Sequence, residues 1–300
     1  MSIRVNPDLY LETLNGLSQT QQSEASALQQ LSTGKRVNTP SDDPAAAAAN
    51  VGLQYQMAAD DQYNQSMSSV TGALQTADST LSSVTTLLDQ AITYGTEAGG
   101  SGLSASNRQV LAAQIQNVQS QIVNLANTTY QGDYIFAGTA TQTKPFTADP
   151  TDPTGMTIQY NGNSSTNSVE ISSGQMMQTS VSGDQIFAGS ANVFNALQQM
   201  AQAAQSGSDM TAPMASLQAA LQQISGRQAV YGNAEQRLQN TESFLASDKV
   251  ELSQQQNNLI GVDLDQAVTN MQQAATARQA ALSAGGQINQ LSLLNYLPQS

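Results

Sequence analysis

Two long stretches of this chain carry apolar residues in alternating steps of four and three, which restricts it to long paired helices. In the first half the stripe comprises Val70, Leu74, Ala77, Leu81, Val84, Leu88 and Ala91. After Pro213 a heptad-like stripe comprises Leu217, Leu221, Ile224, Tyr231, Leu238, Leu245, Leu252 and Leu259. This spacing is that of a coiled-coil seam. The fold class that we predict is mainly α, a long antiparallel coiled-coil-like helical rod formed by both chain halves.

A different composition separates the two helical halves. Residues 132–189 are rich in Gly, Thr, Asn and Asp with short β-prone runs, which predicts a small β-rich lobe inserted in the middle of the chain. Residues 157–160 precede Asn161-Gly162, a strong hairpin signal, and residues 169–171 and 179–181 are further candidate strands. Two near-repeats, at 133–138 and 184–189, enter and leave this segment. We predict that they are neighbouring strands at its neck, although chance recurrence is a real alternative.

These patterns divide the chain into five segments. Residues 1–43 form an N-terminal assembly helix and joint, residues 44–138 the N half of the rod, and residues 139–190 the β-rich lobe. Residues 191–262 form the C half of the rod, and residues 263–300 a C-terminal assembly helix. The chain goes out, passes through the lobe and returns, so the termini should lie together.

The two terminal helices carry apolar stripes that polar residues and glycines interrupt. We predict that both form a subunit interface, through Leu14, Leu17, Leu28, Leu31, Leu264, Val268, Met271, Leu282, Ile288, Leu291, Leu294 and Tyr296. Isolated helices depend on packing of an amphipathic face, so these ends should be largely disordered in the free monomer and fold when subunits dock. If they pair antiparallel, Glu24 falls near Arg278; two unrelated solvated charges are the alternative.

A defined joint follows the first helix. It comprises Gly34, Lys35, Arg36, Asn38, Pro40, Ser41, Asp42 and Asp43. Gly34 stands where a left-handed C-terminal cap is expected, and Asp43 before Pro44 is typical of an N-cap and first helical position. A capping-box start is expected at Ser106, after the glycine-rich turn at 99–102.

Composition argues against several functions. The net charge is −13 and the nine Lys and Arg residues form no basic cluster, so we expect no nucleic-acid binding. No apolar run is long enough for membrane insertion, and the N-terminus lacks the features of a cleaved secretory signal. The chain has no Cys and no His, and no carboxylate pair has calcium-loop spacing. A Ser–Lys pair stays open, but the lysines stand in no recognisable motif. We therefore expect no enzyme activity, no cofactor and no metal.

The joint motif, with the pattern of the two ends, resembles the flagellin superfamily. Three other motifs are similar to its hook–filament junction branch: residues 132–138 followed by Lys144-Pro145-Phe146, residues 185–187 leading into 192–197, and the ending at 291–297. The resemblance implies an adaptor that forms a ring on the first hook–filament junction protein and seats flagellin, at an extracellular position in the bacterial flagellum. A short flagellin forming the filament itself is the alternative. An enzyme carried in the lobe is a third reading, with little room for it.

The same resemblance implies how the chain reaches its position. It would cross the type III export channel unfolded, without a cleaved signal peptide, and a cytoplasmic export chaperone would keep it soluble. The candidate chaperone-binding residues lie in the last helix: Leu282, Ile288, Leu291 and Leu294, with Tyr296 beside them. Packing of this helix against the N-terminal helix is the simpler role for the same side chains.

Overall fold

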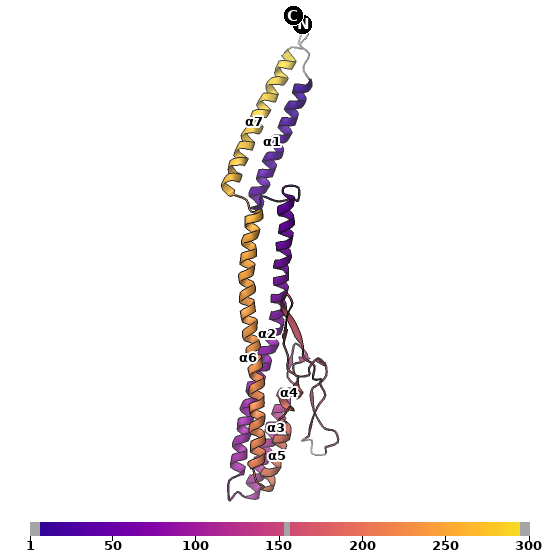
Figure 1. Ribbon diagram of the computed structural model, residues 1–300, viewed down its shortest axis with the longest axis vertical. Helices are drawn as coiled ribbons and strands as arrows, with labels where there is room; N and C mark the ends of the chain where they lie inside the picture. Colours follow the sequence, from indigo (N-terminus) through magenta and orange to yellow (C-terminus); the bar gives the residue numbers. More distant parts are fainter. Residues whose placement is uncertain (1–6, 153–156, 295–300) are drawn as a thin grey trace. The chain divides into compact units, whose positions relative to one another are not determined.

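Long helices dominate the computed structural model, which describes residues 7–152 and 157–294 (Figure 1). The helices are α1 (Pro7–Thr33), α2 (Pro44–Ala98), α3 (Ala105–Ala126), α4 (Gly183–Phe187), α5 (Val193–Ser206), α6 (Thr211–Ile260) and α7 (Leu264–Leu294). Short antiparallel strand pairs lie between α3 and α4, which confirms the predicted mainly α fold with a small β lobe in the middle of the chain. None of the helices, over the ranges described, is both long and apolar enough to cross a membrane.

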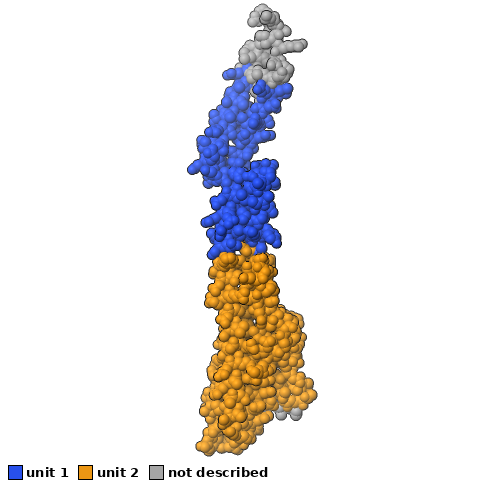
Figure 2. Space-filling model, viewed as in Figure 1, with its two compact units in different colours: residues 1–59, 247–300 blue, residues 60–246 orange. Residues whose placement is uncertain are grey.

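The chain divides into two compact units (Figure 2). One contains residues 1–59 and 247–300, and the other contains residues 60–246. Helices α2 and α6 each contribute to both units because each runs through a unit boundary. The five-segment division drawn from the sequence stays a prediction.

The unit of residues 60–246 is built on the predicted heptad stripes. Leu81, Val84 and Leu88 of α2 are fully buried, in one apolar cluster with Leu217 and Ile224 of α6. Helices α3 and α5 pack against each other and join the same cluster. The four- and three-residue spacing is therefore used as predicted, to bury one face of each long helix.

Over the residues that the structure describes, the β lobe contains three antiparallel strand pairs. Strand β1 (Thr129–Tyr130) pairs with β2 (Asp133–Tyr134), β3 (Phe146–Ala148) with β4 (Ile158–Tyr160), and β5 (Ser168–Ser172) with β6 (Gln175–Gln178). Four buried phenylalanines join the lobe to the helices, with neighbouring ring centroids 5.3–6.0 Å apart: Phe136, Phe146, Phe187 and Phe194.

The two near-repeats do meet, but they are not paired strands. The second forms the single-turn helix α4, whose first residue Gly183 donates its N–H to the Phe136 carbonyl oxygen at 2.8 Å. A Cβ at Gly183 would lie 2.7 Å from that oxygen, so glycine permits the close approach. The turn buries Phe187 edge-on against Phe136. Tertiary packing overrides the β propensity of these residues.

Three local predictions were wrong. Asn161-Gly162 does not close a hairpin, because β4 pairs with β3, the strand before it in the chain, and not with the strand after it. The tight turn lies between β5 and β6, where Gly174 has φ +70°. Residues 179–181 follow β6 and form no strand. The N-cap of α3 is Ser104, not Ser106, because the Ser104 hydroxyl accepts from the Asn107 N–H at 3.1 Å.

Candidate assembly interface

The terminal helices α1 and α7 lie side by side within one unit (Figure 1). Their pairing is antiparallel, and Glu24 of α1 forms an ion pair with Arg278 of α7 at 3.1 Å. The sequence prediction of this contact is confirmed. Among the side chains described on the two helices, Ala27 and Ala267 are the buried apolar ones.

Apolar side chains remain uncovered on both helices. Leu14 is 44% and Leu28 is 59% exposed on α1, while Leu264, Val268 and Leu282 on α7 are 57%, 41% and 52% exposed. Leu14 and Leu28 lie two heptads apart, as do Val268 and Leu282, so each pair shares one helix face. We name these five residues the terminal apolar stripe.

The other predicted interface residues are placed differently. Leu17, Leu31 and Met271 are half-buried. Ile288, Leu291 and Leu294 fall in α7 beyond the side chains that the structure describes, and Tyr296 falls outside the described residues. Their roles at an interface or with a chaperone stay predictions.

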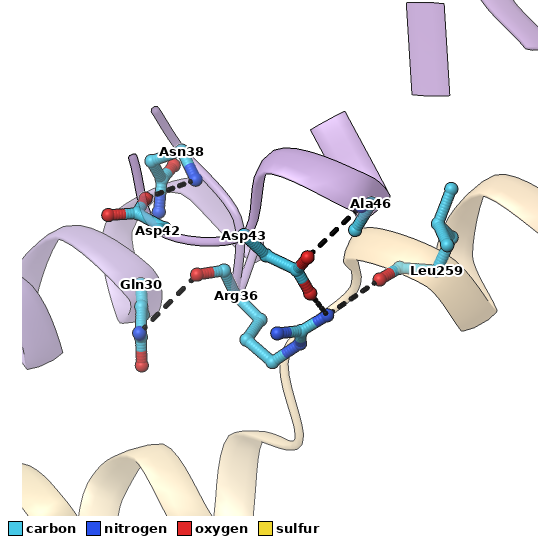
Figure 3. Close-up of polar contacts among 7 residues, drawn as sticks. All are labelled: Gln30, Arg36, Asn38, Asp42, Asp43, Ala46 and Leu259. Atoms are coloured by element: carbon cyan, nitrogen blue, oxygen red, sulfur yellow. Dashed lines mark hydrogen bonds and ion pairs between the residues drawn. The ribbon is translucent and has the colours of Figure 1, made fainter. Parts of the chain in front are cut away.

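The joint between α1 and α2 is a hydrogen-bonded turn (Figure 3). Gly34 ends α1 with φ +69° and donates its N–H to the Gln30 carbonyl at 2.9 Å, as predicted for a left-handed cap. Asp43 starts α2 by accepting from the Ala46 N–H at 3.1 Å, with Pro44 as the first helical residue. Both predicted caps are confirmed.

Asn38 and Asp42 hold the turn between these caps. One Asp42 carboxylate oxygen accepts from the backbone N–H groups of Asn38 and Thr39, at 2.9 and 2.8 Å. The Asn38 amide donates to the Lys35 carbonyl at 2.8 Å. Lys35, Pro40 and Ser41 have exposed side chains, and the Ser41 hydroxyl lies 2.8 Å from that of Thr39.

Hydrogen bonding lowers the pKa of both acids in the joint. For Asp42 the main cause is the Thr39 N–H, followed by that of Asn38. For Asp43 the main cause is the Ala46 N–H, followed by the Arg36 guanidinium. Each donor favours the charged carboxylate, so both side chains are held as anions.

Arg36 ties this joint to the α6–α7 turn, which sequence reasoning did not foresee. Its guanidinium donates to an Asp43 oxygen at 3.1 Å and to the Leu259 carbonyl at 3.0 Å (Figure 3). Its backbone N–H donates to the Ile260 carbonyl at 2.7 Å, and the Val262 N–H donates to the Gly34 carbonyl at 3.1 Å. The sequence signal for this contact was Gly261, which marks a helix break opposite the Gly34 cap.

A small apolar cluster lies under these bonds. Val37, Ala46 and Ile260 are buried together, with Ala47 and Leu259 packed against them. Two helix-to-helix joints more than 200 residues apart in sequence are thereby held together as one structure. Among the residues that the structure describes, no three His, Cys, Asp or Glu side chains gather as a metal site would require.

Comparison with known families identifies the class of this fold. The bacterial flagellin N-terminal helical region matches residues 7–141, and the bacterial flagellin C-terminal helical region matches residues 214–297. Together these matches contain α1 to α3, most of α6 and α7, and the joint. The chain belongs to the flagellin superfamily.

Within that superfamily the chain is similar to flagellar hook-associated protein 3. The Escherichia coli protein of that name is 34% identical over 180 residues, which are 60% of this chain and 55% of that protein. Flagellin B of Helicobacter pylori is 28% identical over 193 residues, which are 64% of this chain and 37% of that protein. The chain thus matches about half the length of the hook-associated relative.

A solved structure shares the fold. The crystal structure of flagellar hook-associated protein 3 from Legionella pneumophila superposes with a TM-score of 0.64 at 13% identity, covering 69% of this chain and 98% of that one.

Proposed function

We propose that this protein is a structural subunit of the hook–filament junction of the bacterial flagellum. In this proposal copies of the chain assemble as a ring on the first junction protein, and the ring seats the flagellin filament. The observation that carries the proposal is the terminal apolar stripe. Five aliphatic side chains, each more than 40% exposed on paired helices, favour burial against another helical surface.

A short flagellin that forms the filament itself is the second candidate. Its terminal helices would need the same physical properties, because they would also pack in an axial assembly. The higher identity to hook-associated protein 3 than to flagellin B favours the junction role. The described residues offer no His, Cys or acidic cluster for metal-dependent chemistry, and the proposal assigns no catalysis to this chain.

Ordering of the ends on docking is part of this proposal. If α1 and α7 are marginal in the free subunit, their ordering would absorb about 2–5 kcal/mol of the docking energy. Assembly would then be slow in solution and favourable on a template. An export chaperone that covers Leu282 and the residues after it would keep the chain from associating before it passes unfolded through the type III channel.

Deletion of the gene separates the two candidate roles. For a junction subunit we expect hooks without filaments and flagellin monomer shed into the culture medium. For a filament subunit we expect loss of the major flagellin band from both cells and medium. Normal filaments in the deletion strain would contradict both roles.

A further inference from the structure

A cavity of about 280 Å³ lies between α2 and the β lobe. All of its lining residues belong to the unit of residues 60–246. Val70, Ala73 and Ala77 of α2 form an apolar wall, and the β1–β2 hairpin forms the opposite side. Ser69, Gln131, Asp133 and Asn167 are exposed at the lining, so the space is open to solvent.

The hairpin side of the cavity presents the ring of Tyr130, whereas Tyr134 pairs with Thr129 and belongs to the other face of the hairpin. Tyr130 and Tyr134 are both half-buried and lie on the paired strands β1 and β2. A side chain at Gly72 of α2 would collide with the Tyr130 hydroxyl, so the glycine makes room for that ring against the helix. Half-buried tyrosines combine an apolar face with a polar tip.

The turn of this hairpin holds a residue other than glycine in the left-handed backbone region. Gln131 and Gly132 both have positive φ, 53° and 94°, which is the two-residue turn that favours Asn, Asp or Gly at its first position. A glutamine there is an unfavourable choice, and such outliers gather at binding sites. It places a long amide side chain at the cavity, where it donates to the Tyr130 hydroxyl at 3.3 Å.

The remaining lining groups are mostly neutral hydrogen-bonding side chains. Ser69 donates its hydroxyl proton to the Ser66 carbonyl at 2.7 Å, which leaves its oxygen free to accept. The Ser180 hydroxyl and the Asn167 amide also line the space. Asp133 is the one lining residue with a formal charge, so nothing in the lining would neutralise an anion.

We propose that this cavity binds one ring of a neutral sugar. A sugar ring offers an apolar C–H face to an aromatic side chain and hydroxyls on its edge to amides, hydroxyls and a carboxylate. Tyr130 supplies the first kind of contact, while Ser69, Gln131, Asp133 and Asn167 supply the second. A volume of about 280 Å³ accommodates one such ring and not a folded chain. A quaternary ammonium ion, which needs an aromatic face and a carboxylate but few donors, is the competing ligand.

Saturation-transfer-difference NMR on the full-length protein tests this directly. The probes are glucose, galactose, mannose and N-acetylglucosamine, with choline as the cationic comparison. We expect transfer to at least one sugar with a dissociation constant near about 1 mM. No transfer to any of the four sugars, or transfer to choline alone, would overturn the proposal.

A matched pair of variants assigns the signal to this cavity. Ser69→Trp fills the cavity from α2. Ser79→Trp is the control, because Ser79 is also an exposed serine of α2 whose hydroxyl donates to the carbonyl three residues earlier, but it lies outside the cavity. We expect about tenfold loss of sugar signal for the first and no change for the second. Asn167→Ala, a change at an exposed lobe residue, gives an independent reading if Ser69→Trp does not fold. Wild-type signal in either folded cavity variant would contradict the proposed site.

Discussion

Glu24 and Arg278 join the two terminal helices at the scale of single residues. Their ion pair is 3.1 Å long and partly exposed, so its contribution to stability should be small, about 0.2–1 kcal/mol. We expect a double-mutant cycle with Glu24→Gln and Arg278→Gln to show coupling of that size. Opening free energies from amide exchange in α1 and α7 provide the measurement. Purely additive effects of the two changes would mean that the pair does not join the helices.

Asp42 and Asp43 give the joint a dependence on pH. Both have lowered pKa values, from an ordinary value of 3.8, so the stabilisation from their hydrogen bonds is complete above that value. It is lost as the pH falls through the lower folded pKa values. We expect amides of Asn38, Thr39 and Ala46 to lose exchange protection below about pH 4.

Matched substitutions test the origin of that loss. Asp42→Asn removes the charge that accepts from Asn38 and Thr39, and it should weaken their protection already at neutral pH. Ser32→Asn, at an exposed position near the end of α1, should leave it unchanged. Protection that persists unaltered to strongly acidic pH in the unsubstituted protein would contradict the role of these carboxylates.

Helix α7 carries an intrinsic weakness at the scale of the element. Gly286 lies within it, and a Cβ added there would meet nothing within 4 Å. Gly286→Ala should therefore stabilise this helix by about 1 kcal/mol. If the ends order only on docking, a more stable α7 should speed spontaneous association of purified subunits, which light scattering would follow.

Gly226→Ala is the control for this change. Gly226 lies in α6 with equally free space around its Cβ position, so its substitution gives the same helix propensity without altering the terminal pair. It should raise the thermal stability and leave the association rate as it was. Equal rates for both variants and the unsubstituted chain would argue against marginal ends.

The helical elements and their caps could be predicted because their signals are local. Gly34 and Asp43 act through bonds to residues within about one helical turn, and Pro44 acts through its own fixed φ. Each long stripe needs only its own spacing to be recognised. The Glu24–Arg278 contact could be predicted because antiparallel pairing of two uninterrupted helices fixes which residues face each other.

The β lobe and the bridging role of Arg36 could not be predicted in the same way. The β-prone residues around Phe187 form a helical turn, in which Phe187 packs against Phe136, Phe146 and Phe194. Asn161-Gly162 carries a hairpin signal, but Tyr160 just before it pairs with Phe146 of the earlier strand β3. Arg36 reaches the carbonyl of Leu259, 223 residues away. Such contacts form only in the folded chain, and the secondary-structure propensity of the local residues does not predict them.

The terminal apolar stripe matters at the scale of the whole molecule, because a structural subunit functions only through its assembly. An aspartate at Val268 or Leu282 should leave the free subunit folded, since both side chains are already 41% or more exposed. It should weaken association strongly, because docking would bury an unpaired charge. In the deletion strain we expect neither variant to restore filaments. The Val268→Asp chain should still be produced and exported, because it leaves Leu282 and the other proposed chaperone-binding residues unchanged.

A third variant distinguishes a specific interface from a general effect of surface charge. Val110→Asp introduces the same charge at a valine of α3 that is 55% exposed and outside both terminal helices. It should support filaments and motility as the unsubstituted gene does, while circular dichroism verifies that all three variants keep their helix content. Full motility with Val268→Asp and Leu282→Asp together would show that the assembled state leaves the stripe uncovered, and the proposed interface would then have to lie on another face of the terminal helices.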